Sequence, residues 1–144
     1  MIVSQILKSK ADIGVISVKP TDYTRDAIKL LSDNRIGTVV VSANGDTLDG
    51  ILSERDIVRE MGKRGTACID EPVSSIMTTK LVTCSPSDNA LNVLEMMTNG
   101  RFRHLPVMQD GAMIGLISIG DVVKARLSEL SMEKDALEGM IMGH

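Results

Sequence analysis

Two matching heptapeptides carry the residue types and the spacing best suited to bind a phosphorylated ligand. They are Gly50–Asp56 and Gly115–Asp121, and each reads as a buried strand that leads into a helix. In each, a serine (Ser53 or Ser118) stands at the junction, and an aspartate follows three residues later. An aspartate in the first helical turn can accept both hydroxyls of a ribose, while the serine hydroxyl and the positive end of the helix face a phosphate.

Helix capping explains the same residues without any ligand. A serine at the N-cap accepts a hydrogen bond from a free amide of the first turn, and an acidic residue at the third helical position returns the contact. Capping accounts well for a single copy and is compatible with ligand binding. Gly50 and Gly115, which open the two motifs, favour a ligand, because glycine permits another group to approach the backbone closely.

The chain is an internal duplication. When the second half is aligned with the first, identical residues match in the same order, with one residue dropped in the turn after Gly45. The matches include Pro20 with Pro86, Asp22 with Asp88, Arg35 with Arg101, Gly50 with Gly115, Ser53 with Ser118 and Asp56 with Asp121. Shared spacing over this length, with a single gap inside a turn, indicates two copies of one structural unit.

Each copy predicts a β-α-β-β-α unit. Apolar and β-branched runs predict strands at 15–18, 38–41 and 50–53, and at 81–84, 105–108 and 115–118. A sheet with helices on one face leaves its other face apolar, so we expect an α/β (α+β) fold in which two pseudo-symmetric units pack sheet to sheet. The expected boundaries are unit 1 at 1–65, a linker at 66–72, unit 2 at 73–128 and a C-terminal helical extension at 129–144.

Composition excludes several classes of function. Aromatic residues make up 1% of the 144 residues and the formal net charge is −3, which argues against binding to nucleic acid. No apolar run approaches the ~20 residues of a membrane span. Without a signal-peptide pattern, and with Cys68 and Cys84 expected to be reduced apolar fillers, we expect a cytoplasmic protein.

The repeated unit resembles the cystathionine-β-synthase (CBS) domain, and the pair resembles a stand-alone bacterial Bateman module. The resemblance covers residues 1–127 and rests on Val18–Asp22, on Arg103–Val107 and on the two heptapeptides. It implies that the Ser-x-x-Asp residues contact the ribose and phosphate of an adenine nucleotide in the clefts between the copies. AMP is the first expectation, with NAD and ATP as alternatives, and the implied role is regulatory: sensing energy or redox state through conformational change.

The resemblance also implies which other residues surround the ligand. The base is expected between the first strand of a unit and the strand before the motif, at Ile16, Ser17, Thr38 and Val39, and at Val82, Thr83, Leu105 and Pro106. Basic residues reach the phosphate in repeat two: Arg101, Arg103 and His104. Repeat one has only Arg55 at the rim of its site, so we expect repeat two to hold the better site; a solvated basic patch is the alternative for these side chains.

The C-terminal residues predict a helix with a heptad pattern. Its apolar positions are Val123, Leu127, Leu130, Leu137 and Ile141, with Lys134 in the same row. This row either packs on its own module or forms a contact in a homodimer, which the resemblance favours. We find no catalytic or metal-binding motif and expect no enzyme activity; the alternative to ligand binding is a structural or dimerisation module with empty clefts. The effector protein is not indicated.

Overall fold

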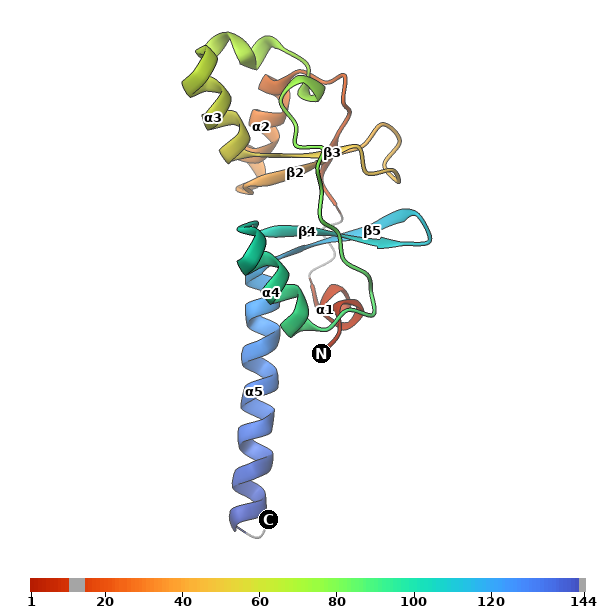
Figure 1. Cartoon of the computed structure of the whole chain (residues 1–144), viewed down its shortest axis with the longest axis vertical. Helices are drawn as coiled ribbons and strands as arrows, with labels where there is room; N and C mark the ends of the chain where they lie inside the picture. The colour runs from red at the N-terminus through yellow and green to blue at the C-terminus, as the bar shows by residue number, and fades with distance from the viewer. Residues whose placement is uncertain (11–14, 143–144) are drawn as a thin grey trace. The chain divides into compact units, whose positions relative to one another are not determined.

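The computed structural model of the chain describes residues 1–10 and 15–142. It divides into two compact units, each with helices and a small β-sheet (Figure 1). The repeat-one unit contains β1 (Ser17–Val18), α2 (Thr24–Asn34), β2 (Thr38–Val41), β3 (Gly50–Ser53) and α3 (Glu54–Arg64). The repeat-two unit contains α1 (Val3–Ser9), α4 (Ala90–Gly100), β4 (His104–Gln109), β5 (Ala112–Ser118) and α5 (Ile119–Met142), except that the hairpin tip, Asp110–Ile114, groups with the repeat-one unit. The mixed α and β fold class and the C-terminal helix are confirmed.

The repeat-one unit is built on a three-stranded sheet. β1 pairs with β2 in parallel and β2 pairs with β3 in antiparallel orientation, with Thr38 opposite Ser53. All four residues of β2 are buried, which explains its uninterrupted β-branched sequence. After α3, a 3₁₀ helix at Thr66–Asp70 occupies most of the segment expected to be a linker, and Cys68 is buried there.

Among its described residues the repeat-two unit has two regular strands, because the predicted strand at 81–84 is reduced to one bridge. Cys84 pairs in parallel with Val107, and its amide donates to the Pro106 carbonyl over 3.0 Å. In repeat one, the amide of Val40 donates to the carbonyl of Ile16 over 3.2 Å. Pro106 stands where Val40 does and has no amide hydrogen, so the equivalent bond to Val82 cannot form and the ladder stops.

We call residues 1–10 and 71–80 the two lead segments, because each precedes one repeat along the chain. Each packs on the other repeat: residues 1–10 pack on repeat two, and residues 71–80 pack on repeat one. In the first, the Val3 amide donates to the Asp88 carbonyl over 2.8 Å, and Val3 and Ile6 lie in the core of the repeat-two unit. In the second, the Val73 amide donates to the Asp22 carbonyl over 2.8 Å, and Val73 and Ile76 lie in the core of the repeat-one unit. The two sets of contacts are equivalent, since Asp22 and Asp88 are aligned positions. Each compact unit is therefore completed by a segment distant in sequence.

Helix α5 continues past the repeat as one uninterrupted helix (Figure 1). Val122 and Ala125 are buried against the rest of the repeat-two unit. The expected extension at 129–144 is the second half of this helix, and its last two residues lie outside the described ones. In the parts of the chain that the structure describes, no helix is both long and apolar enough to span a membrane.

Candidate functional site

The Ser53–Asp56 motif forms a capping box at the start of α3. The Ser53 hydroxyl accepts from the Asp56 amide over 3.2 Å, and the Asp56 carboxylate accepts from the Ser53 amide over 2.9 Å. Local sequence is sufficient to produce this geometry, since the residues are three positions apart at a strand-to-helix junction. The capping interpretation of the motif is confirmed by these two hydrogen bonds.

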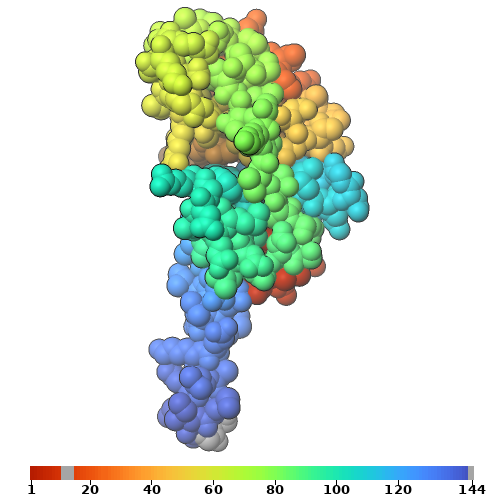
Figure 2. Space-filling model, viewed as in Figure 1, coloured from red at the N-terminus to blue at the C-terminus, as the bar shows by residue number. Residues whose placement is uncertain are grey.

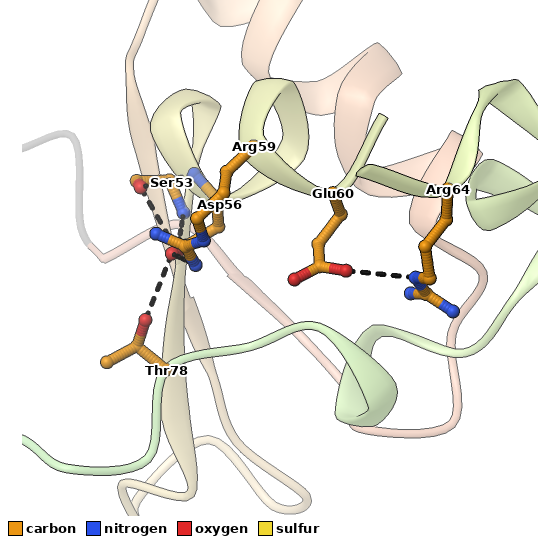
Figure 3. A network of polar contacts seen from close by, with 6 residues as sticks. All are labelled: Ser53, Asp56, Arg59, Glu60, Arg64 and Thr78. Atoms are coloured by element: carbon orange, nitrogen blue, oxygen red, sulfur yellow. Dashed lines mark hydrogen bonds and ion pairs between the residues drawn. The ribbon is translucent and has the colours of Figure 1, made fainter. Parts of the chain in front are cut away.

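The carboxylate of Asp56 is engaged by two further side chains (Figure 3). Its Oδ1 accepts from Arg59 Nη2 at 2.7 Å and from the hydroxyl of Thr78, in the second lead segment, at 3.0 Å. Farther along α3, Glu60 pairs with Arg64 and takes no part in this network. The side chain of Asp56 is only 7% exposed, and both of its oxygens already accept hydrogen bonds. A ligand would have to displace protein groups to reach it.

The equivalent motif of repeat two caps α5 in the same way but has different neighbours. Asp121 Oδ2 accepts from the Ser118 amide over 2.9 Å, and the Asp121 amide donates to the Ser118 hydroxyl over 3.1 Å. The third partner is Lys10, whose Nζ lies 2.8 Å from Asp121 Oδ2 and also donates to the carbonyl of Leu116. The Ser118 amide and Lys10 both contact the same oxygen, Oδ2, and the side chain is 23% exposed.

Lys10 keeps the Asp121 carboxylate charged. Burial alone raises the pKa of Asp121, but the hydrogen bonds from Lys10 and Ser118 outweigh it and hold the pKa below its ordinary value. The carboxylate is therefore ionised at neutral pH, as an acceptor of ribose hydroxyls must be. The ammonium group of Lys10 adds a positive charge beside it, at the N-terminal end of α5.

His104 lies at the same end of the repeat-two unit. The Ile119 amide donates to the Arg103 carbonyl over 2.8 Å, which places the start of β4 beside the Ser118 junction. Burial is the largest cause that lowers the pKa of His104, and the charges of Lys10 and Arg103 lower it further against the opposing effect of Asp121. The imidazole is therefore neutral at pH 7, and an anion bound nearby would favour its protonation.

The glycines that open the two motifs accommodate the lead segments. A β-carbon on Gly50 would lie 2.8 Å from Met77 Sδ and 3.0 Å from the Thr78 carbonyl oxygen. One on Gly115 would lie 2.9 Å from a methyl carbon of Leu7. Our interpretation that these glycines leave room for a ligand is therefore wrong: the close approach that they permit is made by the protein itself.

The remaining predicted residues divide between core and surface. Val39, Leu105 and Pro106 are buried, with Val39 and Leu105 in the cores of their units, and Thr38 is also buried. Arg101 adopts a left-handed conformation (φ 57°) at the end of α4, as Arg35 does at the end of α2 (φ 53°). The other predicted residues are partly or fully exposed: Ile16, Ser17, Arg55, Val82, Thr83 and Arg103.

Lys10, Thr78 and Arg59 contact the motif aspartates, and the sequence interpretation predicted none of these contacts. Lys10 and Thr78 come from the two lead segments, and each reaches the motif aspartate of its unit. A signal was present in the sequence: Val3-Ser4 and Ile6 repeat at Val73-Ser74 and Ile76. The pattern lies outside the repeated β-α-β-β-α unit, so the match between the two units does not reveal it.

Comparison with known proteins agrees with the repeated architecture. The family model for the CBS domain matches residues 4–63 and 73–128. The chain is 36% identical over 148 residues to the mitochondrial CBS domain-containing protein CBSX3 of Arabidopsis thaliana, covering 98% of this chain and 72% of that protein.

Solved structures show the same fold. A CBS-domain containing protein from Agrobacterium tumefaciens has a TM-score of 0.82 and 39% identity, covering 88% of this chain and 99% of the other. A CBS domain protein from Pyrobaculum aerophilum, solved in complex with AMP, has a TM-score of 0.75 and 26% identity, covering 92% and 99%. With two copies matched by one family model over most of its length, the chain belongs to the CBS domain family, as a tandem CBS pair.

Proposed function

We propose that the repeat-two unit binds an adenine nucleotide through Ser118, Asp121, His104 and Lys10. The observation that carries this proposal is the state of Asp121: an ionised, partly exposed carboxylate at the start of α5, paired with Lys10 through Oδ2. In this proposal the carboxylate accepts the ribose hydroxyls. The amides at the start of α5 and the side chains of Lys10 and His104 supply donors for a phosphate.

The family adds support for the class of ligand. The relative from Pyrobaculum aerophilum is a complex with AMP, which makes AMP the first candidate here and leaves NAD and ATP as alternatives. The other predicted contacts remain part of this proposal: Arg101 and Arg103 near the phosphate, and Val82, Thr83, Leu105 and Pro106 near the base. Since Leu105 and Pro106 are buried, their contacts with a base would be made largely through the backbone.

We expect the repeat-one site to bind more weakly. Asp56 already accepts hydrogen bonds from Arg59, Thr78 and Ser53, and its side chain is 7% exposed against 23% for Asp121. Ribose hydroxyls must break the bonds of Thr78 and Arg59 to reach Asp56. Arg55 is exposed and would contribute at the rim of this site. The base would lie along the strands, beside Ile16, Ser17, Thr38 and Val39.

The matching pair Asp121→Asn and Asp56→Asn tests this proposal. Both variants keep an acceptor oxygen for the cap and remove the charge that ribose hydroxyls prefer. By isothermal titration, we expect AMP affinity to fall at least tenfold in Asp121→Asn, a loss of about 1.4 kcal/mol, and to change little in Asp56→Asn. Equal losses in the two variants, or no loss in either, would reject the asymmetry.

A thermal-shift panel of AMP, ATP, NAD and S-adenosylmethionine separates ligand binding from a purely structural role. A ligand that binds only the folded state must raise the melting temperature. If none of the four does so, the alternative of a structural or dimerisation module with empty clefts is favoured. In the proposed role, the protein is a non-catalytic regulator in the cytoplasm that acts as a homodimer, and ligand occupancy changes the conformation that an effector detects.

A further inference from the structure

Helix α5 carries a row of exposed aliphatic side chains along its outer part. Val123, Leu127, Leu130, Leu137 and Ile141 have between 39% and 77% of their surface exposed. With Lys134, they follow the alternating four- and three-residue spacing of a heptad seam. Figure 2 shows the C-terminal half of α5 with no other segment packed over it in this view.

The helix uses a different face for its own unit. Val122 and Ala125 are buried in the repeat-two core, and they lie outside the seam. The hypothesis that the seam packs on its own module is therefore wrong for the described residues. An exposed row of aliphatic side chains of this length, interrupted once by Lys134, is typical of an interaction surface.

We propose that the occupant is a second copy of this chain, whose α5 packs antiparallel to the first with Leu130 opposite the partner's Lys134. In this register Leu127 faces the partner's Leu137, and Val123 faces the partner's Ile141. The contact is two-fold symmetric, so it closes after two copies. At 1.5 Å per residue, the overlap from Val123 to Ile141 is about 27 Å long. It extends the proposed homodimer by naming its surface, and it does not depend on nucleotide binding.

Charge determines the orientation. In a parallel pair, Lys134 would lie against the partner's Lys134, and Glu133 would lie near the partner's Glu138. In the antiparallel register, Lys134 packs against an aliphatic neighbour, and Lys124 faces the partner's Glu138 at both ends of the contact. A pair of Glu133 side chains remains at the centre, next to Lys134 of each copy. The antiparallel register thus removes the Lys134–Lys134 contact and both Glu133–Glu138 contacts, introduces one contact between the two Glu133 side chains, and adds two opposite-charge contacts.

An anionic membrane surface fits this helix less well. Beside the seam, the acidic residues Glu129, Glu133, Asp135 and Glu138 outnumber the basic Lys124 and Arg126, and the outer part from residue 129 onward carries four acidic residues against Lys134. Amphipathic helices that bind membranes carry lysine and arginine on the polar face, since the lipid surface is negative. Acidic flanks would be repelled there.

Sedimentation velocity on the full chain tests the contact itself. We expect a dimer for the natural sequence and a monomer for Leu127→Asp/Leu137→Asp. Both residues are exposed, so the fold should persist, and circular dichroism verifies this. The control Met132→Asp lies on α5 outside the seam, is also exposed, and should leave the dimer intact. A monomeric natural protein, or a Leu127→Asp/Leu137→Asp variant that stays dimeric, would overturn the proposal.

Disulfide trapping tests the orientation. Leu127→Cys and Leu137→Cys are prepared as separate proteins with tags of different size, mixed, and oxidised; the native Cys68 and Cys84 are buried. The antiparallel register predicts cross-linked heterodimers, whereas a parallel pair predicts that each variant cross-links to itself. As a second measurement, Lys124→Glu should weaken the dimer and Lys124→Glu/Glu138→Lys should restore it. Self-cross-linking of either variant alone, or no rescue, would overturn the antiparallel arrangement.

Discussion

Replacing the two motif aspartates with alanine should destabilise the protein to clearly different extents. In Asp56→Ala, the cap contact to the Ser53 amide is lost, at about 1 kcal/mol. The Thr78 hydroxyl loses a charged acceptor, at about 1.5–2 kcal/mol. Arg59, whose side chain is 50% exposed, adds at most about 0.5–1 kcal/mol because solvent screens its pair. The expected total is about 3–4 kcal/mol.

Asp121→Ala removes less. Its cap contact to Ser118 is again worth about 1 kcal/mol, and the Lys10 pair, with side chains 35% and 23% exposed, adds at most about 1 kcal/mol after screening. The two variants should therefore differ by about 2 kcal/mol in the free energy of unfolding, or roughly 4–8 °C in melting temperature.

Urea denaturation followed by circular dichroism measures this difference, since the chain has no tryptophan to report by fluorescence. Asp56→Asn serves as the matched control and should lie between the natural protein and Asp56→Ala, because its amide oxygen still accepts one of the bonds. If Asp121→Ala is as destabilising as Asp56→Ala, the network of Thr78 and Arg59 does not stabilise the repeat-one unit as argued.

Three further predictions concern titration and reactivity. Burial lowers the pKa of His104, so as the pH falls below about 6.5 the imidazole is protonated in the unfolded chain before it is protonated in the folded one. The free energy of unfolding should therefore decrease from pH 7.5 to 5.5. The decrease should be smaller in His104→Gln. Lys10 lowers the pKa of Asp121 against the effect of burial. Lys10→Met should therefore reduce the free energy of unfolding most at pH 7, and the reduction should shrink as the pH falls below about 4 and Asp121 is protonated. A reduction that does not depend on pH would contradict this. Burial, with a smaller effect from Asp88, raises the pKa of Cys84 to about 11, so iodoacetamide at pH 8 should label it only after unfolding, as mass spectrometry of its peptide would show; labelling of the native protein at the rate of a free thiol would refute the burial argument.

The local features of the fold followed from the sequence because short-range chemistry specifies them. The strands at 38–41 and 50–53 match β2 and β3, since a buried β-branched run followed by an Asn-Gly turn leaves few alternatives. The capping boxes at Ser53 and Ser118 depend only on residues three positions apart. The missing third strand of repeat two was also readable in principle, because Pro106 has no amide hydrogen to donate.

Only the tertiary structure decided which segment completes each unit. Lys10 contacts Asp121, and Thr78 contacts Asp56 across a shorter stretch of chain; periodicity cannot indicate either partner, because it describes only neighbours along the chain. These long-range contacts give two equal motifs different environments: one carboxylate is buried in a protein network, and the other is partly exposed and paired with a lysine. The sequence by itself determined that the unit is repeated and where its aspartates stand. The path of the chain, which brings each lead segment to the other repeat, determined what those aspartates contact.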